Sequence, residues 1–228
     1  GLGDVYKRQV KMATFVSLIS GSSGNATFVS DGKTNLLIDC GMSGAKLKES
    51  LHAIDVMPES IDALLITHEH VDHTKGAGVI SRRYNIPIYT TQGTHTSMDI
   101  GNIADENIKI ITEDTDFEIG NIGIRPFAIP HDAAQPVGFN FMIGDEKYSL
   151  ATDIGKMTKS ILEKITGSKK ILLESNHDVE MLKCGTYPYP LKRRILGEYG
   201  HLSNETASKV ALHLVQNGTC LLYTSPSP

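Results

Sequence analysis

The sequence contains no tryptophan and only three cysteines among its 228 residues. Cys40, Cys184 and Cys220 are scattered and odd in number, so they predict neither a disulfide framework nor a paired-cysteine metal site, and they indicate a reducing compartment. No run approaches 18 consecutive apolar residues, and the first ten residues lack the apolar core of a secretory signal. We therefore expect a cytoplasmic protein without a membrane-spanning helix.

An excess of charge is also missing. The chain has 22 basic and 26 acidic residues, a net charge of −4, so any polyanion that it binds has to be held locally. With 40% apolar and 21% charged residues, the composition is that of a globular protein and excludes wholesale disorder. The length suits one domain with an ample core. The nine histidines are the one compositional excess, and they are clustered.

The two ends of the chain do not continue the patterns of their neighbours. The opening GLGDVYKRQ and the closing CLLYTSPSP resemble translated adapter sequence. We therefore expect a non-native leader over residues 1–11, a domain over residues 12–219 whose C-terminal part is missing, and a non-native tail over residues 220–228. Frayed natural termini are the alternative.

Apolar runs typical of strands alternate with helical patterns along the rest of the chain. Strands are predicted over 14–19, 26–30, 35–39, 63–67, 87–89, 108–111, 115–119, 122–129, 137–143, 147–152 and 170–174. Helices are predicted over 44–54, 76–84, 91–98, 156–166, 190–198 and 203–216. This order predicts an α/β fold of stacked sheets with helices outside.

Three histidines and an aspartate lie within six residues, directly after the predicted strand 63–67. In extended backbone His68 and His70 project to the same side, and after a turn Asp72 and His73 can serve a second point nearby. Zn²⁺ and Mn²⁺ accept such mixed nitrogen and oxygen ligands. The run therefore predicts a metal site. Solvated loop histidines are the alternative, which is disfavoured because adjacent imidazoles repel one another once protonated.

The H-x-H-x-D-H run resembles the hallmark of metallo-β-lactamase-fold hydrolases. Further segments resemble the YycJ/WalJ branch of this family: GSSGN at 21–25, ESNHD at 174–178, PYPLKRR at 188–194 and GHLSN at 200–204. The resemblance extends from about Met12 to Thr219. It implies an αββα sandwich, in which two mixed β-sheets pack together with helices outside.

The resemblance also implies two divalent metal ions, Zn²⁺ or Mn²⁺, in a cleft between the sheets. The implied ligands are His68, His70 and His131 for the first ion, Asp72 and His73 for the second, and Asp153 as a bridge. Asp153 has an alternative role as the N-cap of the following helix. A last histidine ligand is expected beyond Thr219, where the tail replaces it, so the second ion would lack one native ligand.

Other residues of these motifs are expected around the metals rather than on them. The resemblance implies that His201 faces the scissile phosphate, although a competing assignment makes it a metal ligand. His177 has either a phosphate contact or a structural hydrogen bond. Asp39 is expected to anchor the metal-binding loop by hydrogen bonds. Cys40 and Cys184 are expected to be small buried residues.

Two neighbouring cations suit phosphodiester hydrolysis. Hydroxide held between them would attack in line, with Asp72 orienting it or accepting its proton and with His201 as acid or electrostatic clamp. Lys192, Arg193 and Arg194, beside two tyrosines, are expected to contact a nucleic-acid backbone and its bases, or else to form a solvated helix face. The resemblance implies a DNA exonuclease, with DNA favoured over RNA as the substrate.

Other functions stay open at this point. One is a phosphodiesterase acting on cyclic phosphates or small nucleotides, and another is a non-catalytic, metal-dependent regulatory protein. Thioester and β-lactam hydrolases use the same metal loop, but the Gly-His-Leu-Ser element favours phosphate chemistry. The sequence does not predict the oligomeric state.

Overall fold

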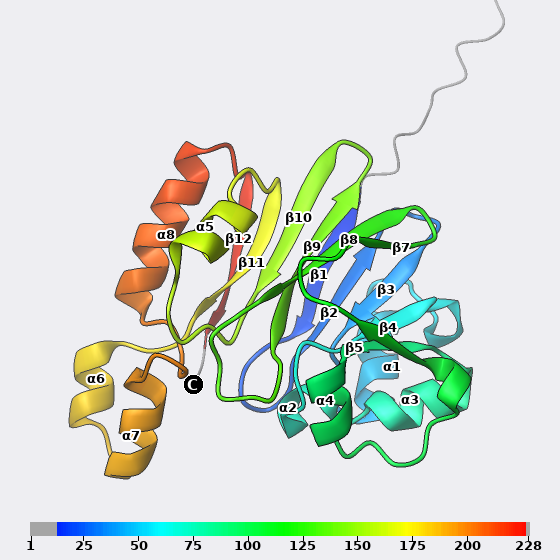
Figure 1. Cartoon of the computed structure of the whole chain (residues 1–228), viewed down its shortest axis with the longest axis horizontal. Coiled ribbons are helices and arrows are strands. Elements are labelled where there is room, and N and C mark those ends of the chain that lie inside the picture. Colours follow the sequence, from blue (N-terminus) through cyan, green and yellow to red (C-terminus); the bar gives the residue numbers. More distant parts are fainter. Residues whose placement is uncertain (1–12, 227–228) are drawn as a thin grey trace, which may run out of the picture.

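The apolar runs form two six-stranded β-sheets that face each other, with helices on their outer sides (Figure 1). This computed structural model describes residues 13–226, the last six of them by their backbone alone. The leader expected over residues 1–11 lies outside the described residues. The architecture confirms the αββα sandwich.

The first sheet has the strands in chain order. Its first three strands are antiparallel and the rest are parallel, which requires crossover connections such as helices. Leu47 and Leu51 of one helix and Ile80 of another pack on its outer face. The elements are β1 (Thr14–Ile19), β2 (Ala26–Ser30), β3 (Asn35–Ile38), α1 (Gly44–His52), β4 (Ala63–Leu65), α2 (Val71–Thr74), α3 (Ala77–Tyr84), β5 (Ile88–Thr91), α4 (Gln92–Ser97) and β6 (Ile108–Ile111), with 3₁₀ turns at Pro58–Ser60 and Asp105–Asn107.

The second sheet begins with four antiparallel strands and ends with parallel ones. Ile161 and Leu214, from two helices, pack against its outer face at Phe127 and Leu173. Its elements are β7 (Phe117–Ile119), β8 (Ile122–Ala128), β9 (Val137–Ile143), β10 (Glu146–Ala151), α5 (Lys159–Ile165), β11 (Lys170–Ser175), α6 (Val179–Cys184), α7 (Tyr189–Leu196), α8 (Asn204–Gln216) and β12 (Leu221–Pro226).

The main core lies between the two sheets. Alternate residues of a strand point to opposite faces, so Leu36 and Ile38 of β3 enter this core, while Leu37 packs under the helices of the first sheet. Phe139 and Phe141 of β9 meet them from the second sheet. Both faces of β3 are covered, and its sequence is apolar from Leu36 to Ile38. In β9 the buried polar Asn140 lies between the two phenylalanines and donates to the Lys164 carbonyl.

Three features differ from the expectations. The tail expected over 220–228 contains β12, whose backbone pairs with β11, while its non-native origin stays a prediction. The short helices α2 and α6 were not predicted, because four and six residues are too few to show a helical period. Cys40 is buried as expected, but Cys184 is exposed, which corrects the expectation for that residue.

Among the described residues, no helix is both long and apolar enough to cross a membrane.

The strand directions bring the polar motifs to one end of each sheet. In the first sheet β3 and β4 are parallel, so Asp39 and the run 68–73 follow strands that end at the same edge. In the second sheet β8, β10 and β11 share one direction, because β9 is antiparallel to both β8 and β10. His131, Asp153 and Glu174 lie at the ends of these three strands.

Backbone contacts fasten the run 68–73 to two earlier turns. The Asn25 amide donates to the Asp72 carbonyl oxygen at 2.8 Å, and the Cys40 amide donates to the carbonyl oxygen of His73 at 2.7 Å. Gly41 lies between these turns, and its amide donates to the Asn25 carbonyl at 2.8 Å. A Cβ atom at Gly41 would lie 1.6 Å from the Asp72 carbonyl oxygen, so only glycine permits this close approach.

Gly41→Ala is expected to lower the free energy of unfolding by about 1–3 kcal/mol or more, because the backbone of Asp72 has to move away. Gly44→Ala is the matched control, since its Cβ would make an ordinary contact of 3.5 Å with Ile80. Urea denaturation followed by circular dichroism measures both variants. Equal stability of the two would contradict the packing described for Gly41.

Candidate functional site

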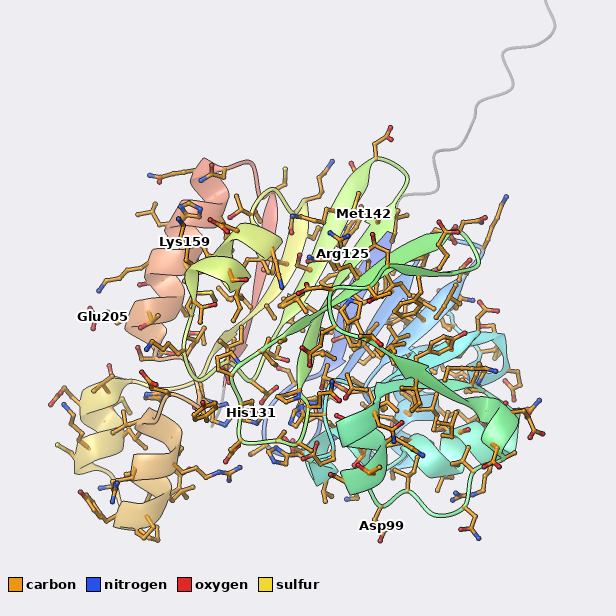
Figure 2. The ribbon with its side chains drawn as sticks, in the orientation of Figure 1. Asp99, Arg125, His131, Met142, Lys159 and Glu205 are labelled. Carbon is orange, nitrogen blue, oxygen red and sulfur yellow. The ribbon has the colours of Figure 1, made fainter. Side chains whose placement is uncertain are left out.

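Histidines and carboxylates from both sheets meet at the ends of the strands, where Figure 2 shows His131. Three groups have potential ligand atoms within 4.8 Å of one another: His68, His70 and His131; His68, His73 and Asp153; and His131, Asp153 and His201. Five of the six predicted metal ligands are therefore brought together. Asp72, the sixth, lies at the rim and belongs to none of these groups.

Hydrogen bonds fix which nitrogen of His68 faces the cluster. Its Nδ1 lies 3.0 Å from the Thr67 hydroxyl, which donates to Asp39 Oδ2 at 2.8 Å. Since the hydroxyl proton is used on Asp39, the hydroxyl oxygen accepts the Nδ1 proton of His68. The lone pair of His68 is then on Nε2, which points to His70 Nδ1 at 3.0 Å.

The same arrangement holds for His73 and His131. His73 Nδ1 donates to Asp39 Oδ2 at 2.8 Å, and His131 Nδ1 donates to the Gly200 carbonyl at 3.2 Å. The Nε2 atom of His131 lies 3.3 Å from His70 Nδ1. Partners that hold one ring nitrogen in this way orient metal-binding histidines. Asp39 therefore has the anchoring geometry that the sequence predicts, and it also accepts from the Thr67 amide at 2.8 Å.

The second half of the cluster surrounds His73 Nε2. Oxygen atoms of Asp72 and Asp153 each lie 3.5 Å from this nitrogen. The side-chain nitrogen Nδ2 of Asn25 lies 3.0 Å from His73 Nε2 and donates to Asp72 Oδ2 at 3.2 Å. Sequence reasoning gave Asn25 no role, although the GSSGN motif contains it. The Asp72 side chain is 35% exposed, which leaves its carboxylate open to solvent.

The electrostatics of the cluster suit a cation. Burial lowers the pKa of His73, but Asp39 and Asp153 outweigh this and raise its pKa to about 9. Burial and the nearby His73 hold the pKa of His68 well below its usual value. A buried set of oriented imidazole nitrogens and carboxylate oxygens is the donor set that Zn²⁺ and Mn²⁺ take. The residues present therefore fit a divalent metal centre.

A second buried pair adjoins the cluster. His201 Nδ1 donates to Glu174 Oε1 at 2.5 Å, and Glu174 Oε2 accepts from the amides of Ile154 and Leu202 at 2.9 and 3.1 Å. Burial lowers the pKa of His201, but Glu174 raises it more, so the pKa lies above its ordinary value. Glu174 was missed as a functional residue. The available signal was a carboxylate at the end of an apolar strand, within the quoted ESNHD motif.

The basic run of α7 has three different environments. Lys192 Nζ donates to the carbonyls of Lys183 and Gly185 at 2.7 and 2.6 Å, at the end of α6. Arg194 makes two hydrogen bonds to Asp132, next to His131. The Arg193 guanidinium lies 6.0 Å from the centre of the Tyr189 ring. Roles of these residues in substrate binding stay predictions.

His177 lies beyond His201 and outside the ligand groups. Its carbonyl accepts from the Asn204 amide at 2.8 Å, while its Nδ1 is buried and has no hydrogen-bond partner among the described residues. The backbone contact of His177 is therefore structural, whereas no hydrogen bond to its ring is found among the described residues.

Residues 34–222 match the family model described as the beta-lactamase superfamily domain, and the chain belongs to this superfamily. It has the metallo-beta-lactamase fold. The crystal structure of YhfI from Bacillus subtilis, a protein of this fold, superposes with a TM-score of 0.71 at 16% sequence identity, and the match covers 94% of this chain and 86% of YhfI.

Within the superfamily, the chain is related to curated exodeoxyribonucleases. It is 37% identical over 210 residues to WalJ of Streptococcus pneumoniae, covering 90% of this chain and 78% of that protein. It is 36% identical over 211 residues to YycJ of Bacillus anthracis, covering 92% and 80%. The resemblance to the YycJ/WalJ branch is thereby confirmed.

Asp39→Asn is expected to weaken metal binding about 10- to 100-fold, because an amide cannot accept from His73 and Thr67 as the carboxylate does. Competition with a chromogenic chelator for Zn²⁺ measures the affinity. Asp145→Asn, at an exposed turn between β9 and β10, is the control and is expected to bind normally. Unchanged affinity of Asp39→Asn, with an unchanged melting temperature, would contradict the anchoring role.

Proposed function

We propose that the protein is a divalent-metal-dependent nuclease that hydrolyses phosphodiester bonds of DNA and acts as an exonuclease. The observation that carries this proposal is the Glu174–His201 pair beside the ligand cluster. His201 Nδ1 lies 3.8 Å from Asp153 Oδ1, and the centres of the His201 and His131 rings are 5.2 Å apart. A proton donor in this position suits the departure of an alkoxide from phosphorus. The names of the two bacterial relatives support DNA as the substrate.

His68, His70 and His131 would hold one ion and Asp72 and His73 a second, with Asp153 within reach of both groups. Ions bound there would polarise the phosphoryl oxygens and lower the pKa of the attacking water. The Asp72 carboxylate accepts a hydrogen bond from the Asn25 side chain and would orient that water or take its proton. These assignments leave His201 free to serve the leaving oxygen.

His201 then acts as the general acid. Its protonated ring has one N–H on Glu174, so its Nε2–H is the proton available to the leaving oxygen. Glu174 stabilises the charged imidazole and fixes its orientation, and the backbone amides of Ile154 and Leu202 hold Glu174 in place. When the proton leaves, the departing hydroxyl is neutral and the ring returns to one proton.

Metal removal is expected to abolish DNA cleavage. End-labelled DNA should be shortened by the metal-loaded protein, left intact in EDTA, and shortened again after Zn²⁺ or Mn²⁺ is restored. Asp72→Ala should lose activity while it keeps its circular dichroism spectrum, and Asp62→Ala is the acidic control. Turnover of bis-p-nitrophenyl phosphate or a cyclic nucleotide without any cleavage of DNA would contradict the nuclease and support a small-molecule phosphodiesterase.

His201→Ala is expected to lower kcat on DNA about 10²- to 10⁴-fold. The loss on bis-p-nitrophenyl phosphate should be much smaller, because p-nitrophenolate leaves without protonation. Glu174→Gln should shift the alkaline limb of the kcat profile to lower pH, since the carboxylate raises the pKa of His201. Initial rates from pH 5 to 10 measure this, with His52→Ala as the control.

The metal content separates the two assignments of His201. A general acid can be removed with both ions retained. Equal losses on the two substrates, together with one fewer metal atom per chain by elemental analysis, would show that His201 is a ligand instead.

A further inference from the structure

Residues 176–200, here called the arm, connect the two members of the Glu174–His201 pair. The arm leaves the sheet at the end of β11, contains α6 and α7, and returns at His201. Figure 1 shows these two helices standing away from both sheets, at the end of the molecule where α2 lies. The arm therefore begins and ends next to the proposed general acid.

The arm encloses a cavity of about 330 Å³ together with the start of α8. This volume is at the lower end of the range of about 300–1,000 Å³ for small-molecule pockets. Met181, Leu182 and Tyr187 provide apolar surface, while Asn204 and His177 provide polar groups. A flat heteroaromatic ring with polar edges matches such a lining.

His177 also lines a second cavity, of about 290 Å³, which His201 borders. The two cavities thus share one wall residue, His177, and His201 lies in the wall of the second. The Nδ1 atom of His177 is buried and has no partner among the described residues, so a ligand in the cavity would meet this ring at its other nitrogen, Nε2. Burial lowers the pKa of His177, so its ring is neutral near pH 7 and can accept or donate a hydrogen bond.

The arm has a small positive charge, with four basic residues and three acidic ones, although the whole chain has a net charge of −4. Lys192 and Arg194 are hydrogen-bonded within the protein, so Arg193, beside Tyr189, is the basic group of α7 that is open to a polyanion. The strongly exposed tyrosines among the described residues are Tyr187, Tyr189 and Tyr199, and all three lie in the arm. Basic side chains beside exposed aromatic rings are the usual surface for a single nucleic-acid strand.

We propose that the arm cavity binds an unpaired nucleobase of the leaving nucleotide, stacked on Tyr187 and within hydrogen-bond reach of His177. The proposal rests on the nuclease function and adds the position of one strand. His201 protonates the leaving oxygen, so the arm cavity, which shares His177 with the cavity beside His201, lies on the leaving side of the scissile phosphate. It follows that the terminal nucleotides are unpaired when they are cleaved, in free strands or melted from a duplex.

The test compares Tyr187→Ala with wild type on oligonucleotides that carry or lack the base on the leaving side. Wild type should show a KM about tenfold higher on the abasic substrate. Tyr187→Ala should show that higher KM on both substrates, and Tyr187→Phe should behave as wild type. Leu212→Ala, on the exposed face of α8, is the surface control. Tyr187 is 46% exposed, so its removal leaves the fold intact, as melting curves can verify.

An abasic penalty that is the same in wild type and in Tyr187→Ala would overturn the base site. An equal penalty for a base removed on the opposite side of the scissile phosphate would overturn its placement. Tighter binding of the wild type to blunt duplex ends than to forked ends would overturn the requirement for unpaired nucleotides.

A readout without cleavage separates this proposal from the nuclease function. A phosphorothioate oligonucleotide with 2-aminopurine on the leaving side resists cleavage, and its fluorescence should be quenched by wild type and far less by Tyr187→Ala. Quenching that depends on Tyr187, in a protein that cleaves no DNA, would contradict the nuclease and leave the base site standing. Cleavage of DNA without such quenching would overturn the base site alone.

Discussion

The Asp39 carboxylate is the interaction on which the candidate centre depends. It accepts hydrogen bonds from the Thr67 amide, the Thr67 hydroxyl and His73 Nδ1, and through that hydroxyl it also orients His68. An ionised group with 3% exposure is tolerated because every one of these donors is in place. One side chain thereby sets the ring nitrogens of two predicted ligands in different halves of the cluster.

The elements that sequence reasoning predicted correctly are those with a local signature. The strand at Leu36–Ile38 shows a continuous apolar run, and the strand around Phe139–Phe141 places an apolar residue at every second position. The run from His68 to His73 places several potential ligands within six residues. Ligand atoms two residues apart in extended backbone meet for geometric reasons that need no knowledge of the rest of the fold. His131 and Asp153 required the family resemblance, since each is a single polar residue after a strand.

What the sequence could not show depends on pairs that are distant along the chain. Asn25 and Asp72 are separated by 47 positions, Glu174 and His201 by 27, and Asp132 and Arg194 by 62. The first contact joins two loops of the first sheet, and the other two join strand ends of the second sheet to the arm and its end, so no periodicity along the chain reports them. For this reason the basic run of α7 read as one surface, whereas Lys192 and Arg194 are bonded within the protein.

Asp39 and Asp153 share a backbone feature, with φ angles of 60° and 57° in the left-handed region. Besides glycine, asparagine and aspartate are the residues that adopt this conformation most readily, whereas glutamate pays a steric penalty there. Glycine removes the carboxylate and asparagine removes its charge. At these two positions almost every substitution therefore either strains the backbone or removes the charged carboxylate, so we expect few replacements to preserve both.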